Sequence, residues 1–106
     1  MVPIEKYGEL SAKAMASDQF IINGENGSRI KYALIDDIMC ITDVFVPEEF
    51  RGRGIARQMM ESLSHSKMFL EAVSDNLSAK TIIKFYESVG FYHIGKRYMY
   101  KEGVKV

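Results

Sequence analysis

Apolar and polar positions alternate as they do in β-strands through much of the first half of the chain. Phe20–Ile22 is followed by two asparagines and two glycines, which tolerate the positive φ angles of a tight connection, and strand-like residues resume over Arg29–Ile35. This pattern predicts a β-hairpin. The β-rich run Ile38–Val46 then predicts a well-buried strand, which ends at Pro47 because proline has no N–H for the ladder.

Further along the chain, apolar residues recur with the period of a helix. Ile55, Met59 and Leu63 fall on one helical face and predict a helix that begins at Gly54. A second helix is predicted over Ser78–Gly90, and its final glycine suits a left-handed C-terminal stop.

The remaining segments complete the pattern of an α/β domain. Met68–Val73 is an apolar run that predicts a strand between the two helices, and the polar Ser74–Asn76 is expected to cap the second helix. Phe91–Lys101 predicts a closing strand, or a hairpin bent at Gly95, and helix formers over Tyr7–Met15 predict a short helix. We therefore expect a single sheet flanked by helices.

Composition and charge narrow the class of protein. With 106 residues, 47% hydrophobic and 26% charged, residues 1–106 are expected to form one folded domain. Basic and acidic residues both number 14, which leaves no net charge to attract nucleic acid or an anionic membrane. No apolar run approaches the roughly 20 residues that cross a bilayer. We expect a cytoplasmic protein that binds neither nucleic acid nor membrane.

The cysteine and the histidines offer no metal site. Cys40 is the one cysteine, so that it has no internal disulfide partner, and its apolar neighbours favour a buried structural thiol over a nucleophile. His65 and His93 lie far apart, with no Cys or His at ligand spacing. No metal cofactor is expected.

Two glycines lie between the predicted strand and the first long helix, in the segment VPEEFRGRGIA (residues 46–56). Gly52 and Gly54 directly precede the helix, whose first N–H groups have no intrahelical partner and favour an anion. Because these glycines have no Cβ, the backbone can approach a phosphate closely. An ordinary turn with a solvated arginine face is the alternative interpretation.

Arginines add positive charge to the same turn. Arg51, Arg53 and Arg57 could each bind phosphate oxygens in pairs. The segment lacks the GxxxxGK[ST] pattern, and no GxGxxG opens a helix here, which excludes P-loop and dinucleotide-binding interpretations. A single copy between two periodic elements is also not typical of a disordered, nucleic-acid-binding RGG segment.

Two segments resemble the GNAT superfamily of acyl-CoA-dependent N-acyltransferases. Arg51–Ala56 is similar to the R/Q-x-x-G-x-G/A signature of that family, and Val44–Phe50 resembles the strand and lead-in before it. Downstream, Phe85–Phe91 (FYESVGF) resembles the LYEKxGF-type helix end. Both matches occur in the family's order, with a helix and a strand between them.

The resemblance implies a mixed, mostly antiparallel sheet whose two central strands, Ile38–Val46 and Met68–Val73, splay apart to admit the pantetheine arm of acetyl-CoA. The residues that it implies for cofactor binding are Val44, Phe45, Val46, Arg51, Gly52, Arg53, Gly54, Ile55, Ala56 and Asn76. Asn76 lies three residues earlier than the family's asparagine, so that helix capping is its alternative role.

The resemblance also implies two catalytic residues. Asp43 is expected to accept the proton of the attacking amine, directly or through water, with Asp36 and Asp37 as weaker candidates. A solvated or capping strand residue is the alternative for Asp43. Tyr86 matches the tyrosine that often protonates the departing thiolate, and a helix-packing aromatic is its alternative role.

The function expected is an N-acetyltransferase that moves an acetyl group from acetyl-CoA directly to a primary amine of a small molecule or protein. A non-catalytic acyl-CoA-binding module that acts on a partner protein is the alternative. Only about 19 residues precede the first clear strand, so the family's acceptor-binding wall is shortened or is supplied by a partner chain, such as the second copy in a homodimer.

Overall fold

The protein is built on one six-stranded sheet in which a single parallel pair lies at the centre. The computed structural model describes residues 7–63, 67–72, 78–94 and 97–102. The strands are β1 (Phe20–Asn23), β2 (Arg29–Ile35), β3 (Ile38–Phe45), β4 (Lys67–Glu71), β5 (Tyr92–Ile94) and β6 (Tyr98–Glu102). Their order is β1-β2-β3-β4-β6-β5, with β3 and β4 parallel and every other neighbouring pair antiparallel. The predicted mixed, mostly antiparallel sheet is confirmed.

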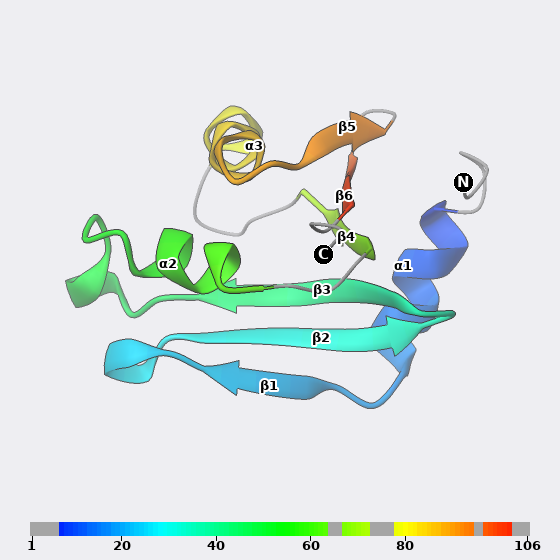
Figure 1. Cartoon of the computed structure of the whole chain (residues 1–106), viewed down its shortest axis with the longest axis horizontal. Helices are drawn as coiled ribbons and strands as arrows, with labels where there is room; N and C mark the ends of the chain where they lie inside the picture. Colours follow the sequence, from blue (N-terminus) through cyan, green and yellow to red (C-terminus); the bar gives the residue numbers. More distant parts are fainter. Residues whose placement is uncertain (1–6, 64–66, 73–77, 95–96, 103–106) are drawn as a thin grey trace.

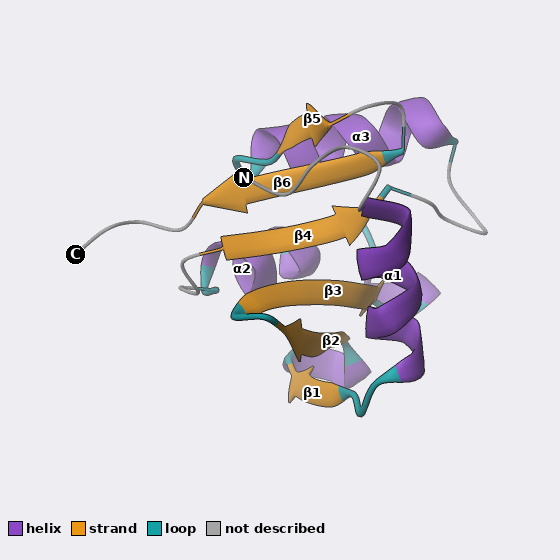
Figure 2. Cartoon of the chain, turned by 90° about the vertical axis from the view of Figure 1, so that its right-hand side faces the viewer, coloured by secondary structure: helices purple, strands orange, loops and turns teal. Residues whose placement is uncertain are grey.

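Helices cover both faces of this sheet (Figure 1). The α-helices are α1 (Tyr7–Ala16), α2 (Ile55–Glu61) and α3 (Ala79–Ser88), and two short 3-10 helices, η2 (Glu25–Gly27) and η3 (Glu48–Phe50), follow β1 and β3. In Figure 2, α1 lies in front of the sheet and α2 and α3 lie behind it. We call the two surfaces of the sheet the α1 face and the α2/α3 face.

Each face has its own apolar cluster. On the α2/α3 face, Met60 and Met68 are buried in a cluster that includes Tyr86. On the α1 face, Tyr7 stacks on Phe69 with ring centroids 5.4 Å apart. Because both faces of β4 are buried, its sequence is an apolar run rather than an alternating one.

A β-bulge changes which side chains of β3 point to which face. β3 pairs with β2 at Tyr32↔Ile41 and next at Lys31↔Asp43, so that Thr42 is an extra residue. Before the bulge, Cys40 belongs to the cluster under α1, and after it the odd-numbered Asp43 takes that face. The bulge therefore places the carboxylate of Asp43 opposite Lys31, where continuous pairing would put Thr42.

The two central strands separate just beyond this point. β3 and β4 pair from Met39↔Met68 to Ile41↔Leu70, whereas β3 continues to Phe45. The expected splay of the central strands is confirmed. The expectation that β3 is well buried throughout is wrong for its second half, because residues 38–41 are buried and residues 42–45 are half-buried.

The structure moves one predicted helix cap, and two other predicted features fall on residues that it does not describe. Ser78 caps α3, since its side chain accepts a hydrogen bond from the N–H of Thr81 at 3.2 Å. The polar residues 74–76, for which a cap was expected, and the expected bend at Gly95 lie outside the described residues. Gly90 has φ of 100°, as predicted for the end of that helix.

Candidate active site

A cavity of about 810 Å³ occupies the gap between the splayed strands. One wall is the second half of β3, and the opposite wall includes Leu70 and Glu71 of β4. The glycine-arginine turn with the start of α2 forms one end, and α3 contributes Ile82, Phe85 and Tyr86. Among the described residues, no strand pairs with β3 beyond Ile41 on the side of β4, so that its backbone N–H and C=O groups there can pair with a ligand.

The glycine turn has the backbone shape that a phosphate cradle requires. Gly52 and Gly54 have φ of 80° and 79°, a conformation that strains any other residue. A Cβ built on either glycine meets no atom within 4 Å. The space beside both glycines is therefore open, and Gly54 is the N-cap of α2. Because α2 has only seven residues, the N–H groups of the turn matter more than the helix dipole.

The three arginines of the turn differ in their contacts. Arg51 donates from Nε to the carbonyl of Val46 at 2.9 Å, which fixes the turn to the end of β3. Arg57 donates to the side chain of Ser88 at 2.8 Å and links α2 to α3. The guanidinium of Arg53 lies over the ring of Phe50 at 5.5 Å. Two of the arginines thus hold the site together as well as adding positive charge.

Tyr86 lies in the wall of the cavity and is 7% exposed. Its ring packs edge-on against Phe85 and Phe91, with centroids 5.3 and 5.8 Å away. Burial raises the pKa of its hydroxyl from 10.0 to about 12, and the charge of Asp43 adds to this rise. The hydroxyl is therefore a proton and hydrogen-bond donor at neutral pH.

Asp43 and Thr42 line the cavity from β3. Asp43 is 43% exposed, and its Oδ2 lies 3.7 Å from Nε of Arg29. Thr42, at the bulge, donates its hydroxyl to Gln19 and lies 3.3 Å from the carbonyl of Lys31. The predicted base therefore lies beside the bulge, within electrostatic reach of Tyr86.

Glu71, at the end of β4, is a cavity residue that the sequence analysis missed. Its Oε1 accepts a hydrogen bond from Ser11 of α1 at 3.1 Å, and Arg97 lies 2.7 Å from its Oε2. The sequence carries a signal for it, since Glu71 is the one charged residue in the apolar run Met68–Val73, which is predicted to flank the gap. Two carboxylates, one from each splayed strand, thus line the cavity.

The structure brings most predicted site residues together. The lining includes Asp43, Val44, Phe45, Val46, Arg51, Gly52, Gly54, Ile55, Ala56 and Tyr86. Arg53 is not among the lining residues, and Asn76 lies outside the described residues. Asp36 and Asp37 form the tight turn before β3, at its far end from the gap, so that neither is placed to act as the base.

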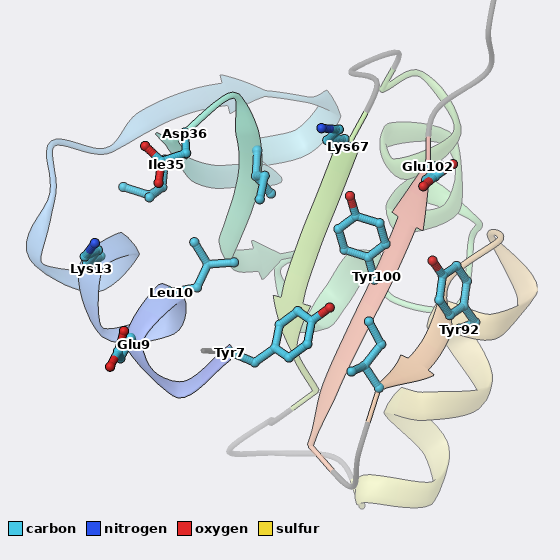
Figure 3. Close-up of a pocket in the computed structure, with 12 residues that line it drawn as sticks. Tyr7, Glu9, Leu10, Lys13, Ile35, Asp36, Lys67, Tyr92, Tyr100 and Glu102 are labelled. Atoms are coloured by element: carbon cyan, nitrogen blue, oxygen red, sulfur yellow. The ribbon is translucent and has the colours of Figure 1, made fainter. Parts of the chain in front are cut away.

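A second cavity, of about 590 Å³, lies on the α1 face (Figure 3). Figure 3 shows the rings of Tyr7, Tyr92 and Tyr100 around it, and burial is the main cause that raises the pKa of Tyr7 and of Tyr100. Asp36 is the one sequence-predicted candidate in its lining. The second cavity thus contains none of the glycine-arginine turn and is separate from the gap.

Cys40 has the structural role expected of it. Its side chain is 1% exposed, and its pKa is raised to about 11, chiefly by burial and secondarily by Asp36. A thiol in that state is not a nucleophile at neutral pH. Among the described residues, no group of three or more His, Cys, Asp or Glu side chains is placed to hold a metal ion. Within the same residues, no helix is long and apolar enough to cross a membrane.

Sequence comparison identifies the family. The model of the "Acetyltransferase (GNAT) domain" matches residues 16–93. The protein therefore belongs to the GNAT acetyltransferase family, whose general activity is acyl transfer from acyl-CoA. A comparison with curated proteins finds no match.

Solved structures show the same fold. The anti-CRISPR protein AcrVA5 matches with a TM-score of 0.64 at 24% identity, over 79% of this chain and 98% of its own. A GNAT-family acetyltransferase from Staphylococcus aureus Mu50 matches with a TM-score of 0.60 at 11% identity, over 92% of this chain and 76% of its own. A GNAT-family protein from Bacteroides thetaiotaomicron matches with a TM-score of 0.59 at 19% identity, over 80% of this chain and 61% of its own. At these identities the likeness concerns the fold.

The raised pKa of Tyr86 predicts a pH-dependent stability. The unfolded chain ionises this tyrosine near pH 10 and the folded chain near pH 12, so the stabilisation is complete below pH 10 and is lost as the pH rises towards 12. The loss amounts to roughly 2 to 3 kcal/mol. Urea unfolding between about pH 9 and about pH 11.5 should show a steeper decline for the wild type than for Tyr86→Phe. Tyr32→Phe, outside the cavity, should keep the wild-type slope, and parallel curves for wild type and Tyr86→Phe would refute the assignment.

Proposed function

We propose that the chain is an N-acetyltransferase that moves an acetyl group from acetyl-CoA directly to a primary amine, with residues 1–106 acting as one acyl-CoA-binding domain. The observation that carries this proposal is the cavity at the splay of β3 and β4, whose lining includes both the glycine turn and Tyr86. A volume of about 810 Å³ is within the range of small-molecule sites.

The cofactor would lie along the free edge of β3. Its pyrophosphate would bind the N–H groups at Gly52, Gly54 and the start of α2, where no side chain blocks the approach. Its pantetheine amides would pair with β3 beyond Ile41, where the ladder to β4 has ended. A backbone N–H near the bulge would polarise the thioester carbonyl as a fixed dipole.

Proton transfer would involve Asp43 and Tyr86. The attacking nitrogen must be neutral, and an alkylammonium has a pKa of about 10, so that a base has to remove its proton. Asp43 would accept it directly or through water. A thiol such as that of cysteine has a pKa of about 8.5, well below that of Tyr86. Tyr86 would therefore stabilise the departing thiolate by donating a hydrogen bond while keeping its own proton.

A non-catalytic acyl-CoA-binding module that acts on a partner protein is the second candidate. Both functions require binding of acetyl-CoA, and only the enzyme transfers the acetyl group to an amine. Tight acetyl-CoA binding without transfer to any amine of a broad panel would establish the module and refute the enzyme.

The cofactor site predicts that Gly54→Ala weakens acetyl-CoA binding at least about tenfold, because the new Cβ would occupy the space of the phosphate. Gly27→Ala is the matched control, since Gly27 has φ of 79° and its added Cβ meets only Pro47 at 3.6 Å. Both variants carry the left-handed strain of roughly 1 to 2 kcal/mol. Calorimetric titration with acetyl-CoA should separate them. Equal losses in both would attribute the effect to strain, and no binding by the wild type would refute both functions.

The role of Tyr86 predicts that Tyr86→Phe lowers kcat by roughly 10- to 100-fold and leaves the KM for acetyl-CoA nearly unchanged, because the hydroxyl acts on the leaving group. Tyr100→Phe, in the second cavity, is the control and should retain both constants. Release of CoA with a saturating amine measures the effect. A wild-type kcat in Tyr86→Phe across the pH range would remove the assignment.

The two carboxylates of the cavity are distinguished by isosteric amides. If Asp43 is the base, Asp43→Asn should lower kcat by about 10²-fold or more. Glu71→Gln should retain most of the wild-type kcat, because its carboxylate is held by Ser11 and Arg97. The opposite pattern would assign the base to Glu71.

A further inference from the structure

Two basic residues of β2, Arg29 and Lys31, lie on the α1 face, beside the gap between the central strands. β2 is regular, so Arg29 and Lys31 share a face with Ala33, which is buried under α1. Arg29 pairs with Phe45, and Lys31 pairs with Asp43, which places all four side chains on that face. α2 and the glycine turn belong to the opposite face. An acceptor that does not compete with the CoA phosphates would thus enter past these side chains.

Arg29 is held in this position by one aromatic contact and one charge. Its guanidinium carbon lies 4.5 Å from the centroid of the Phe45 ring. Its Nε lies 3.7 Å from Oδ2 of Asp43, which is within ion-pair reach but too far for a hydrogen bond. Among the described residues, this Nε is a buried side-chain nitrogen without a hydrogen-bond acceptor.

These contacts leave the binding capacity of the guanidinium largely unused. Stacking on Phe45 occupies a face of the guanidinium plane, whereas its N–H groups lie in the plane and along its edge. A buried N–H without an acceptor is costly, and a carboxylate is the acceptor that matches the guanidinium fork. Because Nε itself is buried, the 37% exposure of the side chain belongs to its other atoms, and a ligand in the cavity can reach the guanidinium through these.

We infer that Arg29 selects an acceptor amine that also carries a carboxylate, either an amino acid or a peptide with an acidic residue beside the reactive lysine. This inference rests on the proposed acetyl transfer. The amine would lie by Asp43 and the carboxylate by Arg29, so that opposite charges of the acceptor meet opposite charges of the site. The pairing orients the nitrogen towards the bulge and adds no chemical step of its own.

Paired acceptors test this inference. The small pair is 4-aminobutyrate and its amide, and the peptide pair is acetyl-Ala-Lys-Glu-Ala-amide and the same peptide with Gln for Glu. Wild type should show a kcat/KM roughly 10- to 100-fold higher for the carboxylate member of at least one pair, as a charged hydrogen bond requires. The pair that shows the preference identifies the acceptor as free or peptide-borne.

Variants of Arg29 and Lys31 show which residue causes the preference for acceptors that carry a carboxylate. Arg29→Gln should reduce the ratio to about one and leave the Kd for acetyl-CoA unchanged. Lys31→Gln removes the same charge from the same strand face, but Lys31 is not among the cavity-lining residues, and it should keep the ratio. No preference in the wild type refutes the inference. If Arg29→Gln lowers kcat/KM equally for both members of a pair, Arg29 positions Asp43 and does not bind the acceptor. If Arg29→Gln binds acetyl-CoA more weakly, Arg29 contacts the cofactor.

A binding measurement separates this inference from the proposed function. Glutarate and glutaramide are titrated by calorimetry into the CoA-bound wild type and into Arg29→Gln. Glutarate should bind at least about tenfold more tightly than glutaramide, and only to the wild type. If no amine is acetylated but this difference holds, the transferase is refuted and the carboxylate site stands. If amines are acetylated but neither assay shows the difference, the carboxylate site is refuted alone.

Discussion

The site depends on the place where hydrogen bonding between β3 and β4 stops. A parallel pair at the centre of a sheet normally continues to the strand ends, since unpaired backbone groups are costly. Here pairing ends at Ile41 and Leu70, one residue before β4 ends at Glu71, whereas β3 continues to Phe45. The resulting gap between β3 and β4 is a cavity, which is bounded by the glycine turn and by α3. A ligand with amides along its length can replace the missing strand.

The bulge at Thr42 gives this gap its chemistry. An extra residue reverses the alternation of β3, so that Val44 packs against the α2/α3 cluster while Asp43 faces the side of α1. The reversal brings a charge beside the gap without burying it in the core. It also places Phe45 under the guanidinium of Arg29. One local irregularity thus determines which groups meet an incoming amine.

α1 contributes to the site although it packs mainly against β2 and β3. Its Ser11 donates to Glu71, and Gln19, just beyond the helix, accepts from Thr42. These contacts connect α1 and the residues after it to Glu71, the last residue of β4, and to Thr42 at the bulge of β3. The second half of β3 is half-buried, and the side chain of Arg29 beside it is 37% exposed.

The sequence by itself determined the order of the elements and most of the cofactor wall, because both are local. Periodicity located the helices, and positive φ made glycine necessary at positions 52 and 54. Only the tertiary structure decided that Glu71 and Arg29 belong to the same cavity and that Asp36 and Asp37 do not. Such facts depend on strand register and on the extra residue at Thr42. Neither leaves a periodic signal, since each arises from pairing between strands and not from the pattern within one strand.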